Sequence, residues 1–351
     1  MISSVTYSEQ HIRELQTASK GDPGLIERTL YAFGLLEALR KVGMDFIFKG
    51  GTSLLLLLPH PRRLSTDIDI VVEPGTNVDV FIERAGSVFP FVSKEEQKRQ
   101  VSDNIVKRLF KFTYDSPLMK TPLYILLDVL FEENHYVCVT EKEIQNELLI
   151  TSGENLKVKV PSIDCILGDK LTAFAPYTTG IPLGKNKDLE VAKQFYDIGT
   201  LIDEFESFED VRNTFFSLSE TELDYRKSTA TPKDALEDTI RAAICIGSRG
   251  KFSPEDFPSY FQGTRSVGNH VFDSRFSMEV ASRMAPKVIY MATCLLTGEP
   301  FAKNIDLNSL KAEILTQQDL KTMKSFRKLR TEEYGYLVLA DRLLREYRAE
   351  N

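Results

Sequence analysis

Cysteine and histidine are scarce in this sequence, which has only four of each among its 351 residues. The cysteines lie far apart and none has CxxC spacing, so they exclude a disulfide framework and a cysteine-based zinc site. They are typical of small apolar side chains in a reducing compartment: Cys138, Cys165, Cys245 and Cys294. The histidines are equally scattered, which argues against a histidine-based metal site or a catalytic triad: His11, His60, His135 and His270.

Long apolar runs are missing as well. There is no window of 18 or more apolar residues and no signal-peptide pattern, so we expect a cytoplasmic protein without a membrane segment. The net charge of −7 argues against a protein that coats nucleic acid, although a local basic patch can still bind one. The remaining composition, 42% hydrophobic and 27% charged, is that of an ordinary globular chain with room for two or three structural units.

The pattern of apolar residues changes near residue 160. Before it, β-rich runs alternate with helical periodicity: strands are predicted at 46–48, 68–72, 105–114 and 123–131, and helices at 23–42, 54–58 and 78–88. After it, helical periodicity dominates at 162–175, 189–205, 232–246, 277–296 and 331–348, between polar loops such as 176–188 and 247–276. The sequence therefore predicts an α+β fold, with a mixed α/β domain at 1–160 and a helical domain at 161–351.

Two carboxylates, Asp67 and Asp69, lie at the start of the apolar segment that ends at Val72. On a strand, Asp67 and Asp69 project to the same face, where their mutual repulsion becomes tolerable if a divalent cation lies between them and a third ligand. Asp128, the one acid inside the apolar run YILLDVLF, is the candidate for that third ligand. The alternative is that the two acids end an exposed edge strand and that Asp128 caps a neighbouring element, because Asp-x-Asp is a common sequence.

A diglycine precedes these acids. Gly50 and Gly51 can adopt backbone angles closed to other residues and let a phosphate approach the main chain. Thr52 or Ser53 can cap the helix that follows, and its N-terminus attracts anions. Strand, glycine turn, helix and acidic strand together favour a site for a triphosphate and magnesium, whereas the diglycine alone favours only a tight turn.

Three motifs resemble those of one family. Lys49-Gly50-Gly51-Thr52-Ser53-Leu54, followed by Arg63-x-Ser65-x-Asp67-x-Asp69, resembles the first motif of the AbiEii/MenT toxins of bacterial toxin–antitoxin and abortive-infection systems. Asp169-Lys170-Leu171-x-Ala173 resembles the second motif, a helix whose lysine meets nucleotide phosphates. The stretch 193–201, with Lys193, Tyr196 and Asp197, resembles a later motif, although many relatives have an arginine–aspartate pair where this chain has Lys193-Gln194. Lys187 and Asp188 compete with Lys193 and Asp197 for those roles.

The resemblance implies a polymerase-beta-like nucleotidyltransferase fold and a metal-dependent transfer from a nucleoside triphosphate, with two magnesium ions. It implies metal ligands at Asp67, Asp69 and Asp128, and catalytic roles for these three together with Lys170 and Asp197. The implied nucleotide-binding residues are Lys49, Gly50, Gly51, Thr52, Ser53, Arg63, Ser65, Lys170 and Lys193. The implied acceptor is an RNA 3′ end, tRNA in particular, with growth arrest as the outcome and a cognate antitoxin as a partner.

Two other functions are compatible with the same residues. One is a kinase-like or AMP-transferring enzyme that acts on a protein hydroxyl through the same phosphate and metal site. The other is a non-catalytic module that binds a nucleotide or a partner, against which the three intact acids count. The basic run KTMKSFRKLR (321–330) would place Lys321, Lys324 and Lys328 on one helical face, with Arg327 beside them. A solvated helix face explains that run more simply than an RNA contact.

Overall fold

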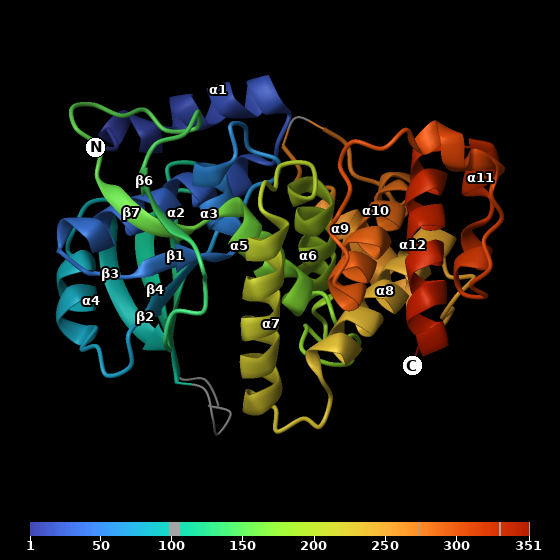
Figure 1. The fold of residues 1–351 in the computed structure, drawn as a ribbon. Helices are drawn as coiled ribbons and strands as arrows, with labels where there is room; N and C mark the ends of the chain where they lie inside the picture. Colours follow the sequence, from blue (N-terminus) through green and yellow to red (C-terminus); the bar gives the residue numbers. More distant parts are fainter. Residues whose placement is uncertain (98–105, 273, 330, 351) are drawn as a thin grey trace. The chain divides into compact units, whose positions relative to one another are not determined.

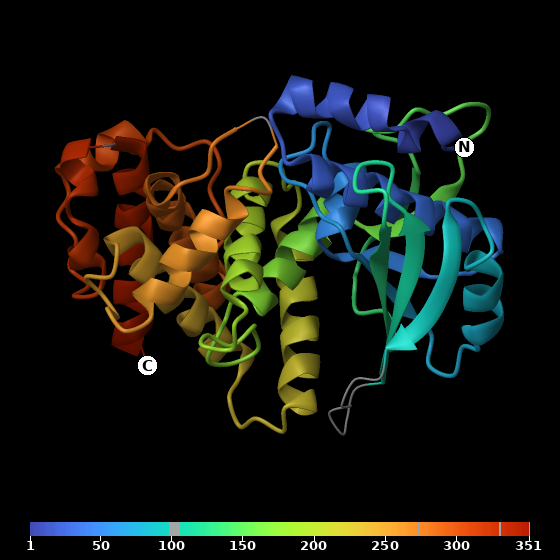
Figure 2. The same cartoon turned by 180° about the vertical axis from the view of Figure 1, so that it is seen from behind.

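The computed structural model describes residues 1–97, 106–272, 274–329 and 331–350. The chain forms two compact units: unit 1 comprises Met1–Ile163 and Asn269–Ser274, and unit 2 comprises Asp164–Gly268 and Arg275–Asn351. Figures 1 and 2 show their elements from opposite sides. No helix among the described residues combines the length and the apolar character that crossing a membrane requires.

Unit 1 is built on a seven-stranded mixed sheet with the strand order β3-β4-β5-β2-β1-β7-β6. The β2–β5 and β1–β7 pairs are parallel, and the other neighbours are antiparallel. The strands are β1 Ile47–Lys49, β2 Ile68–Val72, β3 Phe91–Gln97, β4 Lys107–Asp115, β5 Pro122–Phe131, β6 Val139–Glu143 and β7 Lys157–Pro161. This sheet, combined with a helical second half of the chain, confirms the predicted fold class.

The two faces of the sheet differ in burial because side chains alternate along each strand. Phe110 and Phe112 of β4 and Ile125 and Leu127 of β5 are buried in the core of unit 1, together with the apolar side of helix α2 (Pro23–Lys41). The intervening residues of both strands are half-buried or exposed. The sheet therefore has one core face and one open face.

The helices of unit 1 include the one that the sequence marks most clearly. The side chain of Asp22 accepts a hydrogen bond from the Leu25 N–H, and Pro23 occupies the first helical position, so α2 begins as predicted. The other helices of this unit are η1 Ser4–Tyr7, α1 Glu9–Ser19, α3 Gly50–Leu57 and α4 Asp79–Ala85.

Unit 2 is helical, and its helices pack closely where small residues allow it. A Cβ added at Gly263 of α9 would lie 2.1 Å from the carbonyl oxygen of Asp188, the first residue of α6. The principal helices are α5 Ile163–Ala173, α6 Asp188–Leu201, α7 Phe208–Tyr225, α8 Pro232–Ser248, α9 Phe257–Val267, α10 Met278–Thr297 and α12 Thr331–Glu350. Short helical turns precede α12: η2 Leu307–Ala312, η3 Leu320–Met323 and α11 Phe326–Leu329.

Some elements differ from the sequence-based predictions. Helix α9 lies inside the segment 247–276, for which the sequence predicts a loop. A proline in its first turn and four buried residues support a short helix in this polar sequence. Helices α1 and α7 and strands β3, β6 and β7 were not predicted. The basic run at 321–330 is divided between η3 and α11, so its lysines do not share one continuous helix; Arg330 lies outside the described residues.

Candidate active site

Two of the three predicted acids, Asp69 and Asp128, lie side by side on the open face of the sheet in unit 1. Asp69 of β2 is the direct register partner of Asp128 of β5 and also of Lys49 of β1. Directly paired residues on neighbouring strands project to the same face, so one row across three strands carries a lysine and two carboxylates. All three side chains are half-buried, between the core and solvent.

Gly50 adjoins this row and is required there on two grounds. Its φ of +77° is a conformation that side-chain-bearing residues rarely adopt. A Cβ at Gly50 would also lie 2.2 Å from Oδ2 of Asp69. The diglycine therefore does more than turn the chain, because its missing side chain leaves space for the Asp69 carboxylate against the main chain.

Helix α3 begins directly at this glycine. The predicted cap is wrong: Lys49 occupies the N-cap position, without a side-chain cap, and Thr52 and Ser53 lie within the helix. The hydroxyl of Thr52 donates to the carbonyl oxygen of Asp67 at 2.6 Å, and that of Ser53 donates to the carbonyl oxygen of Gly50 at 2.8 Å. Both residues are fully buried. Their hydroxyls therefore hold the glycine turn and the acidic segment in place.

Arg63 lies against the same turn. Its guanidinium approaches Gly51 so closely that a Cβ there would lie 2.4 Å from Nη2, and the side chain of Arg63 also donates to the Leu64 carbonyl oxygen at 3.3 Å. Only 5% of Arg63 is exposed. The positive charge that the motif places before the acids is thus packed beside the first turn of α3.

Asp67 occupies the position just before β2, so the strand register does not place it in the row. Its Oδ1 lies 4.0 Å from Nη2 of Arg28 on α2, and its main chain is held by Thr52. Thr29, the next residue of α2, donates from its hydroxyl to the carbonyl oxygen of Ser65 at 3.0 Å. The N-terminal part of α2 thus supports the segment that carries Ser65 and Asp67, a contribution that sequence reasoning missed because no local pattern links residues so far apart.

The carboxylates suit a magnesium ion chemically, since this cation prefers oxygen ligands. The register brings Asp69 and Asp128 side by side, and Asp67 precedes Asp69 by two residues in the sequence. Across the described residues, however, no group of three or more histidine, cysteine, aspartate or glutamate side chains is gathered closely enough to hold a metal ion. The donor types fit the ion, and the three-ligand site stays a prediction.

Lys170 and Asp197, from the second and third motifs, form an ion pair inside unit 2. Nζ of Lys170 on α5 lies 3.0 Å from Oδ2 of Asp197 on α6, and the two side chains are only 7% and 1% exposed. This burial excludes the ordinary alternatives of a solvated lysine and a surface acid. Lys193, one helical turn before Asp197 on α6, is half-buried.

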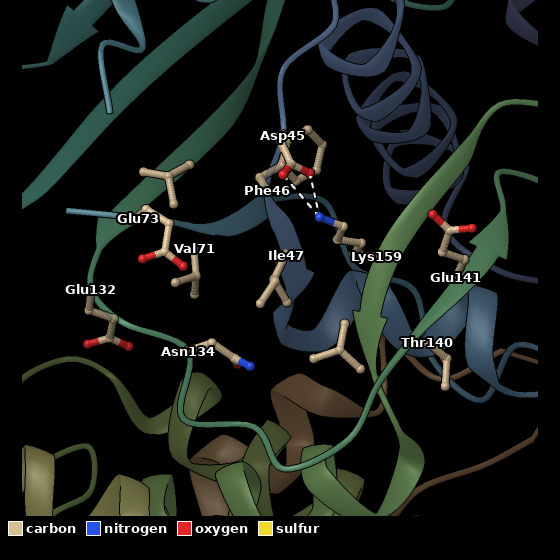
Figure 3. A pocket seen from close by; sticks show the side chains of 12 residues that line it. Asp45, Phe46, Ile47, Val71, Glu73, Glu132, Asn134, Thr140, Glu141 and Lys159 are labelled. Carbon is tan, nitrogen blue, oxygen red and sulfur yellow. Dashed lines mark hydrogen bonds and ion pairs between the residues drawn. The ribbon is translucent and has the colours of Figure 1, made fainter. Parts of the chain in front are cut away.

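A cavity of about 400 Å³ lies in unit 1 along the same sheet (Figure 3). Ile47 and Val71, which are register partners, belong to its lining and lie two residues from Lys49 and Asp69 on the same face. Asp45 and Lys159 pair across part of it at 2.9 Å. The further acids of the lining are Glu73, Glu132 and Glu141. An excess of carboxylates over the single lysine makes this cavity unsuited to a triphosphate but open to uncharged groups.

A second cavity, of about 370 Å³, lies in unit 2 beside α8 and α9. Asp238 in its lining is 6% exposed and accepts hydrogen bonds from the Tyr177 N–H at 2.7 Å and the Thr178 hydroxyl at 3.0 Å. Burial raises the pKa of the Asp238 carboxyl to about 6, and these two hydrogen bonds partly oppose the shift. The group therefore titrates in mildly acidic solution, above the ordinary range of an aspartate.

Comparisons with known proteins agree with the motifs. Residues 35–259, well over half of the chain, match the family model described as nucleotidyl transferase AbiEii toxin, type IV toxin–antitoxin system. Among curated proteins, none matches the chain.

Solved structures from Helicobacter pylori are similar at low identity. JHP933 has a TM-score of 0.44 at 13% identity, over 78% of this chain and 94% of its own. A protein named as a candidate nucleotidyltransferase has a TM-score of 0.45 at 14% identity, over 78% of this chain and 96% of its own.

Proposed function

Because the chain belongs to the AbiEii family of nucleotidyl transferase toxins from type IV toxin–antitoxin systems, we propose that it transfers a nucleoside monophosphate from a triphosphate to an acceptor hydroxyl. The observation that carries this proposal is the row of Lys49, Asp69 and Asp128 beside the Gly50 turn. In this row a lysine, which suits a phosphate, lies beside two carboxylates, which suit a metal counter-ion, on the open face of the sheet.

The nucleotide phosphates would lie at the start of α3. Gly50 and Gly51 carry no side chains of their own at this turn, and the N-terminus of a helix attracts negative charge. Lys49 at the N-cap position and Arg63 beside Gly51 add positive charge near this turn. We propose that Ser65, half-buried before Asp67, borders the phosphates, while Thr52 and Ser53 act by fixing the backbone.

Asp67, Asp69 and Asp128 would hold two magnesium ions. When bound, such ions stabilise the charge that develops on the attacking and leaving oxygens of an in-line displacement. The chain's own part is to orient the carboxylates: Gly50 leaves space for Asp69, Thr52 holds the main chain of Asp67, and the β2–β5 register sets Asp128 beside Asp69. Asp128, on the strand farther from the glycine turn, would lie on the side of the attacking hydroxyl and help to remove its proton.

Lys170, Asp197 and Lys193 extend the proposal to unit 2. An ammonium held at a fixed position by a buried carboxylate is suited to meet a phosphate, because lysine binds phosphate as a point charge. We propose that Lys170 contacts nucleotide phosphates, that Asp197 positions Lys170, and that Lys193 adds charge at the same helix.

We propose the 3′ end of tRNA as the acceptor and the cytoplasm as the site of action. The family implies a cognate antitoxin as a partner. The uncharged base and ribose of the donor nucleotide would occupy the cavity of Figure 3, two residues along the strands from the carboxylates.

Incubation of the purified protein with each labelled nucleoside triphosphate, magnesium, total RNA and total protein tests the proposal. Label in tRNA supports it. Label in protein would instead identify an enzyme that modifies a protein hydroxyl, and an absence of label in both fractions would favour a binding module.

A further inference from the structure

The open face of the sheet continues past Asp128 toward the start of β5. Side chains alternate along a strand, so Leu126 and Tyr124 project from the same face as Asp128. Tyr124 is four residues from Asp128, a separation of about 13 Å at ~3.3 Å per residue. Its side chain is unusual for a strand within a sheet, since 42% of the residue is exposed. A large aromatic ring thus faces solvent in line with the acids.

Lys111 of β4 covers this ring. It is the register partner of Leu126, and its Nζ lies 4.7 Å from the centroid of the Tyr124 ring. The same ammonium lies 2.9 Å from Oε1 of Glu95 on β3. An exposed cation–π contact of this kind is worth only about 0.5–1 kcal/mol, and exposed ion pairs contribute similarly little. The ammonium can therefore leave the ring for another partner at small cost.

The position of Tyr124 relative to the glycine turn indicates which substrate it can meet. In the strand order, β1 and its Gly50 turn lie on one side of β2, and β5 and β4 lie on the other. An in-line displacement requires the attacking and leaving oxygens on opposite sides of the reacting phosphorus. If the phosphates that leave lie at the glycine turn, the acceptor approaches over β5 and β4, which is where Tyr124 and Lys111 project.

We propose that Tyr124 and Lys111 form a platform for the acceptor RNA, on which an unpaired base near the 3′ end stacks against the Tyr124 ring while Lys111 moves to a backbone phosphate. The proposal deepens the acceptor assignment made above and rests on it. Stacking on an aromatic ring tolerates any base, whereas single-stranded ends are the parts of RNA whose bases are free to stack. The platform therefore recognises an unpaired end rather than a base sequence.

The platform also explains the charge balance of this face. Glu95 holds Lys111 over the ring in the free protein, and it opposes RNA by its own negative charge. Replacement of Glu95 by glutamine removes that charge and frees the ammonium, so Glu95→Gln is expected to tighten RNA binding, whereas Lys111→Gln weakens it and reduces its dependence on salt.

The test uses the full-length protein and a fluorescein-labelled single-stranded RNA with a free 3′ hydroxyl, without nucleoside triphosphate, so that binding is measured apart from transfer. Because stacking contributes about 1–3 kcal/mol per base, Tyr124→Ala should weaken binding roughly 5- to 150-fold, while Tyr124→Phe, which keeps the ring, should bind as the wild type does. Tyr177→Ala is the matched control, since Tyr177 is an exposed tyrosine of unit 2 outside the platform.

In the transfer reaction, Tyr124→Ala should raise KM for RNA by a similar factor, with KM for the nucleoside triphosphate and kcat at saturating RNA unchanged. Wild-type protein that does not bind the RNA, or binds it no more tightly than Tyr124→Ala does, overturns the platform. Tyr124-dependent RNA binding by a protein that transfers no nucleotide would support the platform and refute the proposed function, so the two failures are distinguishable.

Discussion

Breaking the Lys170–Asp197 pair should destabilise unit 2 strongly. The charged atoms are 3.0 Å apart and the side chains are 7% and 1% exposed, so replacement of either residue leaves the other charge inside the protein. At an effective dielectric constant of about 20, the attraction between unit charges at this distance is roughly 5 kcal/mol. Removal of one partner of a buried pair typically costs about 3–5 kcal/mol, because the remaining charge cannot regain its hydration. Lys170→Met should therefore lower the free energy of unfolding by about that amount.

The double variant Lys170→Met/Asp197→Leu separates stability from chemistry. Replacement of both charges by apolar groups of similar volume is often neutral or stabilising, so the double variant should recover most of the stability lost in Lys170→Met. Urea unfolding followed by far-ultraviolet circular dichroism measures all three proteins. An Lys170→Met protein that unfolds at the urea concentration of the wild type would refute the reasoning.

The same variants define the function of the pair. If Lys170 contacts nucleotide phosphates, the double variant should be folded yet remain poor in nucleotide transfer, with a raised KM for the triphosphate. Transfer at the wild-type rate by the stable double variant would show that the pair only supports the fold.

Further predictions concern the Gly50 turn, the buried carboxyl of Asp238 and the basic run at 321–330. Gly50→Ala should lose nucleotide transfer, because the new Cβ displaces the Asp69 carboxylate, and its φ of +77° should cost about 1–3 kcal/mol of stability. Gly153→Ala is the control, with φ of +67° and nothing within 4 Å of the added Cβ; it should lose stability but keep its activity in the same assay. Asp238 keeps its proton in the folded chain up to a pKa of about 6 but loses it near 3.8 when unfolded, so its contribution to stability falls by about 3 kcal/mol as pH rises from about 4 to 6. Urea unfolding across this range should show the stability of the wild type declining by that amount relative to Asp238→Asn. Replacement of Lys321, Lys324 and Lys328 by glutamine should leave the salt dependence of RNA binding unchanged, since η3 and α11 do not align them on one helix; a flatter dependence would restore an RNA-binding role.

Local signals predicted much of the fold. Apolar runs with β-branched residues located β2 to the residue and β5 to within one residue, and the Asp22-Pro23 signal located the start of α2. Helix α7 begins with a comparable signal, because the side chain of Ser207 accepts a hydrogen bond from the Asp210 N–H, although the sequence analysis predicts no helix there. The amphipathic pattern of α9 is short and interrupted by glycine, so its stability depends on packing against α6, which no local window contains.

The candidate site could be predicted from the sequence where its residues are close together in the chain or alternate along one strand. The i, i+2 spacing and the apolar surroundings of Asp128 led to the acids, and the structure adds that Asp69 and Asp128 are register partners. The roles of Thr52 and Ser53 could not be predicted, because a hydroxyl near a helix start can cap the helix or bond to a more distant carbonyl with equal ease. Arg28 beside Asp67 and Lys111 over Tyr124 depend on how distant segments pack, which the sequence does not show.

The central claim is that Asp69 is part of a nucleotidyl-transfer centre, and the rate of Asp69→Asn tests it most directly. The substitution keeps the shape of the side chain beside Gly50 and removes its charge. With labelled nucleoside triphosphate, magnesium and tRNA, the account predicts a rate lower by several orders of magnitude, since metal ions contribute several kcal/mol to the stabilisation of the transition state. Circular dichroism and urea unfolding should match those of the wild type or show a more stable protein. A folded Asp69→Asn protein that transfers nucleotide to tRNA at the wild-type rate would contradict the account.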